Sequence, residues 1–173
     1  AVIYNVNWNG LLTTGKLDNN LINIIEDDAC IQGTRPEYVE YGNKWFVASA
    51  DYGNKNNEVR LYDPIKLATA TKTSEPGVLV AKFTCSPWVQ NIHFIKENNI
   101  LVLIQNQIEG RRWRFTFLDF KASIKDGHEK VIKVIDVDRN DELEGFTLMT
   151  NKNKAIAVSS SRKDNLNLLE ISW

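Results

Sequence analysis

The sequence contains few residues of the kinds that support metal centres and disulfide scaffolds. Its 173 residues include two cysteines, Cys30 and Cys85, and two histidines, His93 and His128. Neither cysteine belongs to a CxxC pair or to a Cys/His cluster, which argues against a disulfide-dense scaffold and against a zinc site with the usual ligands. The sequence leaves open whether Cys30 and Cys85 are bridged or are two buried thiols.

The chain also lacks an excess of charge of one sign and any long hydrophobic run. Charged residues make up 25% of the sequence and the formal net charge is -1, so no strong electrostatic field favours an anionic partner. The basic run at 111–114 stands alone, and we expect no nucleic-acid partner. No apolar run approaches the roughly 20 residues that a membrane-spanning helix requires, so we expect no membrane partner either.

Familiar catalytic motifs are missing as well. The sequence contains no GxSxG, no HExxH and no glycine-rich phosphate loop, so motifs leave open whether the protein is an enzyme. His93 falls within an expected strand, which favours a packed or channel-lining histidine over a general base. His128 lies in a polar segment beside Asp126 and Glu129, where we expect it to be solvated.

The residues that are abundant favour β-strands along almost the whole chain. Short apolar or alternating runs rich in Val, Ile, Phe, Trp and Tyr are separated by clusters of Gly, Asn, Asp and Lys. Only the stretches 63–73 and 119–130 invite a helical interpretation. Both are short and polar and follow a strand, so we predict long loops there, with at most one helical turn each.

The strand pattern repeats along the chain with a period of 55 residues. The run WFVAS at 45–49 aligns with ILVLI at 100–104 and with AIAVS at 155–159. Each repeat contains four strands, and four-stranded repeats of about this length are the sequence signature of a β-propeller. A β-sandwich or barrel of about thirteen strands is the alternative, but such folds give no reason for a fixed period.

We therefore predict one all-β domain, a partial β-propeller of about three and a quarter four-stranded antiparallel blades. The predicted blades are 1–27 (incomplete), 31–83, 86–137 and 141–173 (incomplete). Propellers have four or more blades, so we expect the chain to be the C-terminal half of a larger one. The expected last strand, 166–173, would leave an open edge. Its expected partner is the N-terminal half of the propeller, on the same or a separate chain, or a second copy.

Polar residues occupy the entry to each expected inner strand, where the blades of a propeller converge on the axis. These positions hold Arg35, Gln90, Asn91 and Glu144. We expect the four side chains to meet around one small polar ligand or ion. The structural alternative is that they satisfy channel waters and strand-end backbone groups, as in any polar channel.

The loops between the second and third strands of each blade should lie on the same face. They supply further candidate ligand-binding residues: Asp51, Tyr52, Asn106, Glu109 and Arg162, with Trp88 nearby. Planar aromatic rings and forked arginine donors are common binding anchors, and this mixture suits a sugar, an anionic metabolite or a peptide. A solvated rim of turns is the alternative.

The last repeat, DELEGFTLMTNKNKAIAVSSSRKDNLNLLEI, resembles a stretch of phytase-like esterase propellers and their six-bladed relatives, in which LEG and an apolar residue open a blade. In the calcium-dependent relatives, including gluconolactonase-like hydrolases, acidic and asparagine side chains hold an axial cation that polarises the substrate. The resemblance implies Glu144 and Asn91 as metal ligands here. The sequence departs from that pattern because the entry positions supply one carboxylate, Glu144, with Asp141 and Glu142 close by.

Two functions remain in view. The first is a β-propeller module that binds a small polar ligand, a glycan or a protein on its upper face. The alternative is half of a calcium-dependent phytase-like or lactonase-like hydrolase, with Arg35 holding an anionic group. The stretch RPEYVEYGNKWFVASADYG is similar to a blade of secreted or periplasmic sensor-like proteins, which favours such a location.

Overall fold

The protein is described by a computed structural model that covers residues 1–33, 35–55, 57–106, 112–149 and 153–171. Within these residues the strands β1 to β13 form antiparallel sheets, and the predicted all-β class is confirmed. No helix among them is long and apolar enough to cross a membrane.

Each of the four sheets is built from strands that are consecutive in the sequence. Sheet A pairs β1 (Val2–Val6) with β2 (Leu21–Glu26). Sheet B has the order β3 (Glu37–Tyr41), β4 (Lys44–Ala50), β5 (Glu58–Tyr62), β6 (Leu79–Thr84). Sheet C has the order β7 (Val89–Ile95), β8 (Ile100–Asn106), β9 (Trp113–Asp119), β10 (Val131–Val137). Sheet D contains β11 (Leu143–Leu148), β12 (Lys154–Ser159) and β13 (Leu166–Glu170).

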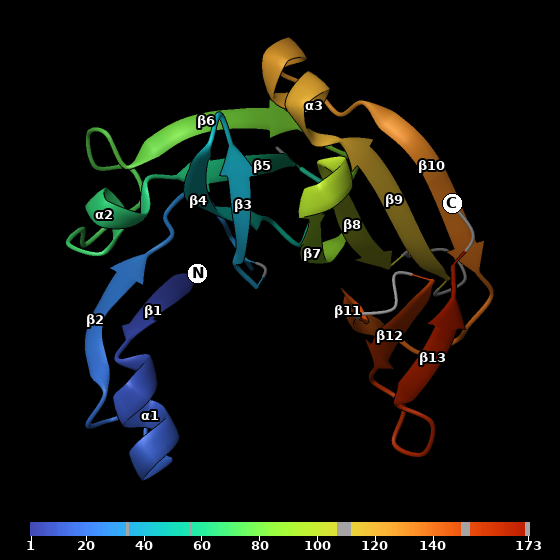
Figure 1. The fold of residues 1–173 in the computed structure, drawn as a ribbon, viewed down its shortest axis with the longest axis horizontal. Coiled ribbons are helices and arrows are strands. Elements are labelled where there is room, and N and C mark those ends of the chain that lie inside the picture. The colour runs from blue at the N-terminus through green and yellow to red at the C-terminus, as the bar shows by residue number, and fades with distance from the viewer. Residues whose placement is uncertain (34, 56, 107–111, 150–152, 172–173) are drawn as a thin grey trace.

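The sheets follow one another around an open arc (Figure 1). The first strands β3, β7 and β11 lie on the inner side of the arc, and β6 and β10 lie on its outer side (Figure 1). The predicted four-stranded antiparallel units are thus present in sheets B and C, and sheet D has three strands. This arrangement is compatible with consecutive blades of a propeller.

A short helix connects the third and fourth strands of sheets B and C and the two strands of sheet A. The helices are α1 (Trp8–Thr14), α2 (Pro64–Leu67) and α3 (Phe120–Asp126). Each begins after a residue whose side chain accepts a helix N–H: Asn7, Asp63 and Asp119. Such a cap stabilises a helix by about 1 kcal/mol. The capping residues Asn7, Asp63 and Asp119 are equally spaced along the chain, and their spacing is close to the predicted 55-residue repeat. The predicted loops 63–73 and 119–130 therefore contain helices, and α3 is longer than the single turn expected.

The hairpins of sheets B and C differ in the length of their turns. Gly42 and Asn43 join β3 to β4 with φ values of 58° and 61°, as a two-residue type I′ turn requires. A longer connection that includes the 3-10 helix η1 (Lys96–Asn98) joins β7 to β8. A shift of one residue along a strand points every side chain to the opposite face of the sheet. Because the two turns differ in length, the fixed offset of 55 residues does not match equivalent side chains throughout sheets B and C.

The core lies between the sheets. Val39, Phe46 and Leu61 of sheet B pack with Leu101 and Leu103 of sheet C. The opposite face of sheet C, with Val102 and Ile104, packs with Leu143 and Ala157 of sheet D. Every residue of β8 is buried, because sheets cover both of its faces. This explains why β8 is a continuous apolar run in the sequence rather than an alternating one.

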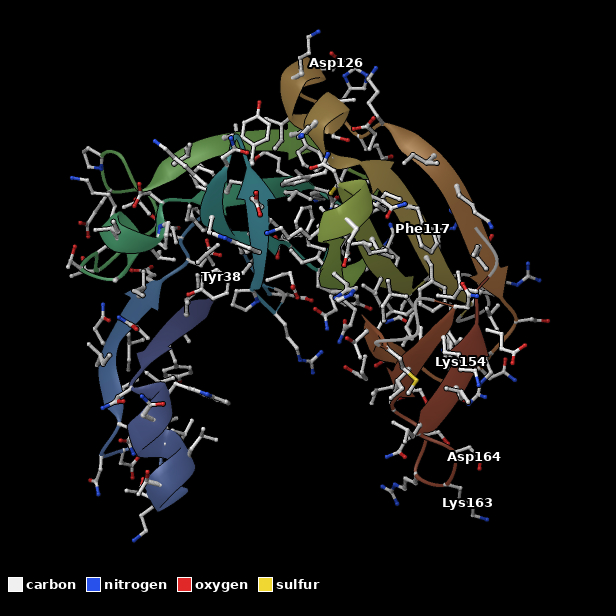
Figure 2. The ribbon with its side chains drawn as sticks, in the orientation of Figure 1. Tyr38, Phe117, Asp126, Lys154, Lys163 and Asp164 are labelled. Carbon is white, nitrogen blue, oxygen red and sulfur yellow. The ribbon has the colours of Figure 1, made fainter. Side chains whose placement is uncertain are left out.

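The two sheets at the ends of the arc are covered less completely. Within the described residues β13 pairs with β12 alone, and Leu166 and Leu168 of β13 are 68% and 62% exposed. In sheet A, Tyr4 is 52% exposed. Tyr38 of β3 lies beside sheet A (Figure 2) and is 60% exposed. Apolar side chains at the ends of the arc are thus left partly in contact with solvent.

Candidate functional site

The structure brings the four predicted entry residues together. The Gln90 side-chain amide donates to Glu144 Oε2 at 2.9 Å, and Arg35 Nη2 lies 3.7 Å from the same oxygen. The main-chain oxygen of Glu144 accepts from Arg35 Nη1 at 2.6 Å and from Asn91 Nδ2 at 3.4 Å. Glu144 of β11 is therefore the point at which the inner ends of sheets B, C and D meet.

A pocket of about 610 Å³ opens beside this group, and we call it the inner pocket. Its lining includes Gln32, Gly33, Arg35, Tyr52, Gln90 and Glu142. Three of these residues, Arg35, Tyr52 and Gln90, are among those proposed from the sequence. The lining combines a guanidinium, a carboxylate, amides and a phenol, so the inner pocket offers both donors and acceptors of hydrogen bonds.

Tyr52 is held by an aromatic neighbour. Its ring meets the ring of Trp88 edge to face, with 5.4 Å between the centroids. Burial, followed by the negative charges of Glu142 and Glu144, raises the pKa of Tyr52 above its ordinary value. The phenol therefore stays protonated at neutral pH and can donate a hydrogen bond into the inner pocket.

Asp51 supports the wall of the inner pocket, although the sequence suggested a direct contact with ligand. Its buried carboxylate accepts the backbone N–H groups of Ile31, Gln32 and Gly33 at 3.1, 3.0 and 3.0 Å. Gly33 has a φ of 70°, a conformation that favours glycine. These bonds use the carboxylate and fix the segment that carries Gln32 into the pocket lining.

Asn106 likewise connects parts of the chain. Its side-chain amide donates to the main-chain oxygen of Leu143 at 3.1 Å and accepts the N–H of Leu143 at 2.7 Å, which ties sheet C to sheet D. Arg162 is exposed in the turn between β12 and β13, which Lys163 and Asp164 mark in Figure 2 and which projects away from β3 and β7. Glu109 lies outside the described residues.

The arrangement around Glu144 does not suit calcium. Calcium is bound by several oxygen atoms, usually carboxylates, carbonyls and water. Glu144 Oε2 already faces Gln90 and the Arg35 cation, and Asn91 turns its nitrogen toward Glu144 while its oxygen accepts the N–H of Ile92. No group of three or more His, Cys, Asp or Glu residues in the described part of the chain is placed to hold a metal ion.

His93 packs against sheet D. Its ring lies edge to face with Phe146 at 5.7 Å, and burial lowers its pKa, so it is neutral at pH 7. Tyr38, which the 55-residue period aligns with His93, instead faces sheet A. The difference follows from the unequal hairpin turns, which place the two residues on opposite faces of their sheets.

A buried polar cluster lies between sheets A and B, and no pattern in the sequence predicts it. The carboxylate of Asp27 accepts from Tyr62 at 3.1 Å, from Thr73 at 3.0 Å and from Ser49 at 3.2 Å. These residues come from separate strands and loops, and none belongs to a recognisable motif. Asp27 is 2% exposed, and the three donors compensate for its burial.

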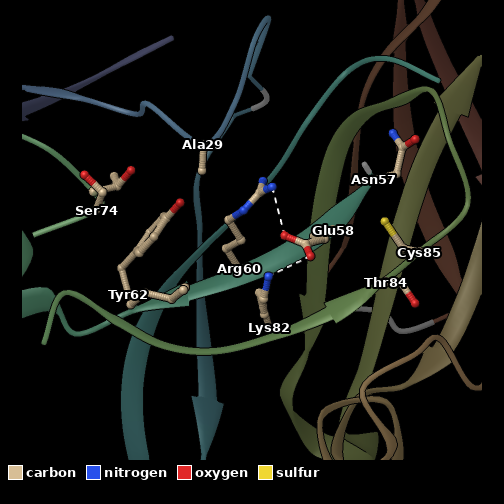
Figure 3. Close-up of a pocket in the computed structure, with 11 residues that line it drawn as sticks. Ala29, Asn57, Glu58, Arg60, Tyr62, Ser74, Lys82, Thr84 and Cys85 are labelled. Atoms are coloured by element: carbon tan, nitrogen blue, oxygen red, sulfur yellow. Dashed lines mark hydrogen bonds and ion pairs between the residues drawn. The ribbon is translucent and has the colours of Figure 1, made fainter. Parts of the chain in front are cut away.

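An outer pocket of about 810 Å³ adjoins this cluster (Figure 3). Glu58 in its wall lies between two cations, 3.0 Å from Arg60 Nη2 and 2.8 Å from Lys82 Nζ (Figure 3). The outer pocket thus has its own internal ion pairs.

The cysteines are two free thiols. Arg60 Nη1 donates to the buried Cys30 sulfur at 3.3 Å, and Cys85 lines the outer pocket. Burial, more than the neighbouring charge of Asp27, raises the pKa of Cys30 to about 12. Burial also raises the pKa of Cys85 to about 12. The sequence left open whether Cys30 and Cys85 form a disulfide, and the structure shows two separate thiols, both protonated at neutral pH.

No protein-family model matches the chain, and no curated protein matches it.

Proposed function

We propose that the protein is a binding module of the β-propeller type that recognises a small polar ligand, with a sugar as the most suitable class, in the inner pocket. The proposal rests on one observation: Arg35, Tyr52, Gln90 and Glu142, from three different sheets and their loops, line a single pocket. The residues are distant in sequence, so their convergence is a product of the fold. A binding function requires this convergence, although a polar channel can also show it.

The chemistry of the lining favours a ligand with several hydroxyl groups. Arg35 and the protonated Tyr52 donate, Glu142 accepts, and the amide of Gln90 has a donor and an acceptor. The side chain of Arg35 is 60% exposed, so it can turn toward a ligand without losing a buried position. A sugar hydroxyl both donates and accepts hydrogen bonds, so it can bind to a donor and to an acceptor that lie side by side in the pocket lining.

We further infer that the sheets are blades of a six-bladed β-propeller and that additional β-structure covers the ends of the arc. Two observations support this inference: apolar side chains of β13 are exposed, and the outer edge of β13 pairs with no other strand among the described residues. The covering sheet belongs to the N-terminal half of the propeller, on the same or a separate chain. The calcium-dependent hydrolase stays a prediction, and the contacts of Glu144 with the described residues Arg35, Gln90 and Asn91 do not favour it.

The binding proposal is tested by nuclear magnetic resonance titration of the ¹⁵N-labelled protein. Glucose, glucuronate and N-acetylglucosamine are added separately at millimolar concentration. We expect at least one sugar to shift the amide signals of Gln32, Gly33 and Gln90. Arg35→Ala and Tyr52→Leu should weaken this response.

Lys121→Ala is the control, because Lys121 is exposed on α3 at the outer side of the arc (Figure 1) and does not line the inner pocket. It should leave the titration unchanged. If none of the three sugars shifts the pocket signals, or if Arg35→Ala and Tyr52→Leu leave the shifts intact, the sugar-binding proposal is wrong.

A further inference from the structure

The outer pocket (Figure 3) offers a second place for a ligand. Its volume of about 810 Å³ falls within the range of roughly 300 to 1,000 Å³ that holds small molecules. Among the described residues, none that lines the outer pocket also lines the inner pocket. A ligand here is therefore independent of the sugar proposed above.

One wall of the outer pocket is a single face of β5 and β6. Glu58, Arg60 and Tyr62 alternate along β5, so their side chains point to the same face of sheet B. In the register of the two strands, Lys82 of β6 is the partner of Arg60. Thr84 is the partner of Glu58. The register therefore explains why all five side chains line the same pocket (Figure 3).

A single carboxylate in this wall is shared by two cations. Glu58 Oε2 lies 3.0 Å from Arg60 Nη2, and Glu58 Oε1 lies 2.8 Å from Lys82 Nζ. Among the described residues that line the outer pocket, Arg60 and Lys82 are the cations and Glu58 is the only carboxylate. The lining therefore has an excess of positive charge.

Two more carboxylates lie close to this wall, and both are engaged by hydroxyl groups. Asp27 accepts from Tyr62 at 3.1 Å and from Thr73 at 3.0 Å. Asp28 accepts from Thr73 at 3.0 Å and from Ser74 at 2.5 Å. Neither Asp27 nor Asp28 lines the outer pocket, so the groups that a ligand contacts there still include more cations than carboxylates.

Arg60 has hydrogen-bond donors that its neighbours do not use. It is 5% exposed, and its guanidinium carries five N–H donors. Among the described residues its acceptors are Glu58 and the Cys30 sulfur, which lies 3.3 Å from Nη1. A thiol sulfur is a weak acceptor, and burial keeps this thiol uncharged by raising its pKa to about 12. Arg60 is therefore a buried cation with unused donors in the wall of a pocket.

Lys82 adds a second cation that can move toward a ligand. Its side chain is 53% exposed, and an exposed ion pair such as the one with Glu58 is weak in water. The forked guanidinium of an arginine matches the oxygen atoms of a carboxylate or a phosphate. A tetrahedral phosphate directs its oxygens to several sides, so it can contact a guanidinium and an ammonium group together. Its charge also approaches about −2 near pH 8.

We propose that the outer pocket binds the phosphate group of a small phosphorylated molecule, with Arg60 and Lys82 as the two cations that hold it. Arg60 donates through the N–H groups that Glu58 and Cys30 leave unused, and Lys82 turns from Glu58 toward the phosphate. The outer pocket is larger than a phosphate ion requires, so the remaining volume holds the organic part of the ligand.

The test is a titration of the ¹⁵N-labelled protein near pH 8, followed by the amide signals of Glu58, Ser74 and Lys82. Inorganic phosphate, glucose 6-phosphate and acetate are added separately, at an ionic strength held constant with sodium chloride. We expect both phosphates to shift these signals and to bind about tenfold or more tightly than acetate. Glucose 6-phosphate should bind at least as tightly as inorganic phosphate. Weaker binding of glucose 6-phosphate would indicate a site for the free ion and contradict the proposed ligand class.

Two glutamine substitutions give opposite expectations. Lys82→Gln removes a cation and should weaken phosphate binding about tenfold. Glu58→Gln removes the carboxylate that competes with the phosphate, and it should strengthen phosphate binding several-fold. Both substitutions break the same ion pair. If that pair had only a structural role, its loss would change phosphate binding in the same direction in both variants.

Lys44→Gln is the matched control, since Lys44 is exposed on β4 and does not line the outer pocket. It should bind phosphate as the unaltered protein does. The thermal unfolding temperature of each variant verifies that it is folded. Because Lys82 is exposed, Lys82→Gln should fold, and it decides the test even if Glu58→Gln does not fold.

The proposal is wrong if inorganic phosphate leaves the three amide signals unchanged, if acetate binds as tightly as phosphate, or if Lys82→Gln binds phosphate as tightly as the unaltered protein. A glucose 6-phosphate response confined to Gln32, Gly33 and Gln90 would report the inner pocket and would also contradict it. Failure here leaves the sugar proposal unaffected, because the two pockets are followed by different amide signals.

Discussion

Arg35 and Glu144 are 109 residues apart in the sequence, yet Arg35 Nη1 donates to the main-chain oxygen of Glu144 at 2.6 Å. The same guanidinium lies 3.7 Å from Glu144 Oε2, which Gln90 also contacts. The pair spans from the segment before β3 in sheet B to β11 in sheet D, across the inner edge of sheet C. It shows that three successive sheets direct their inner strands toward one place.

The first prediction concerns the energy of this pair. Because the side chain of Arg35 is 60% exposed, its charge is screened, and we expect a coupling of at most about 1 kcal/mol with Glu144. A double-mutant cycle with Arg35→Ala and Glu144→Gln, read by urea unfolding, measures the coupling. A much larger value would mean that the pair contributes to stability rather than to the shape of the inner pocket.

The second prediction concerns Asp51. Asp51→Ala leaves three backbone N–H groups without their acceptor, and we expect the free energy of unfolding to fall by about 2 to 3 kcal/mol. Chemical denaturation measures the loss. Asp18→Ala, at an exposed position, is the control and should change stability by less than about 0.5 kcal/mol. Equal effects of the two substitutions would contradict the supporting role of Asp51.

The third prediction concerns the pH dependence of stability through Glu37. Its pKa is raised from 4.5 to about 7 by burial, so the folded state holds a proton that the unfolded state has released between these values. The contribution of Glu37 to the free energy of unfolding is therefore largest below about pH 4.5, and it falls as the pH rises toward 7.

Thermal unfolding of the protein and of Glu37→Gln at about pH 5 and about pH 8 tests this prediction. The variant does not titrate, so its unfolding temperature should rise relative to that of the unaltered protein between the two pH values. A constant difference between the two proteins would show that Glu37 ionises with its ordinary pKa.

The fourth prediction concerns thiol chemistry. Burial raises the pKa of both Cys30 and Cys85 to about 12, so almost none of either thiol is ionised near neutral pH. Because the thiolate is the reactive form, we expect both to react slowly with Ellman's reagent in the folded protein and rapidly in guanidinium chloride. Rapid reaction of one thiol in the folded state would place it at the surface. Cys30→Ser and Cys85→Ser identify which one reacts.

The fifth prediction concerns the open edge of β13. Leu166 and Leu168 are exposed beside this edge, so we expect the isolated chain to associate with itself as its concentration rises. Analytical ultracentrifugation measures the association. Leu168→Lys should weaken it, because a charged side chain at a strand edge opposes pairing. A concentrated solution that remains monomeric would contradict the inference that further β-structure covers the edge.

The order of the strands and their grouping into sheets could be predicted because both are local properties of the sequence. Runs such as ILVLI at 100–104 alternate with polar turn residues, and each run became a strand paired with its neighbour in the chain. The Asn and Asp residues that cap α1, α2 and α3 are a local signal too, but no residue was assigned as a cap, so α1 was missed. Local patterns also placed Arg35, Gln90, Asn91 and Glu144 at the entries of inner strands.

The contacts between the sheets could not be predicted from the sequence. The 55-residue period aligns Tyr38 with His93, but their side chains lie on opposite faces of their sheets. A turn of different length shifts the strand by one residue, and the apolar pattern of the strand does not reveal this shift. The role of Asp51 as an acceptor for the backbone at 31–33 depends on the path of a loop, and a side chain of that kind is equally suited to a ligand.

The sequence by itself determined an all-β chain of short consecutive strands, since strand pairing between neighbours depends on composition and alternation. Tertiary structure alone decided which charged groups are paired. Arg35 and Gln90 contact Glu144, and three hydroxyl groups donate to Asp27. Glu37 has no donor among the residues that the structure describes. The reason is physical: the cost of burying a carboxylate depends on donors that come from strands and loops distant in sequence, and only the packed sheets bring those donors within reach.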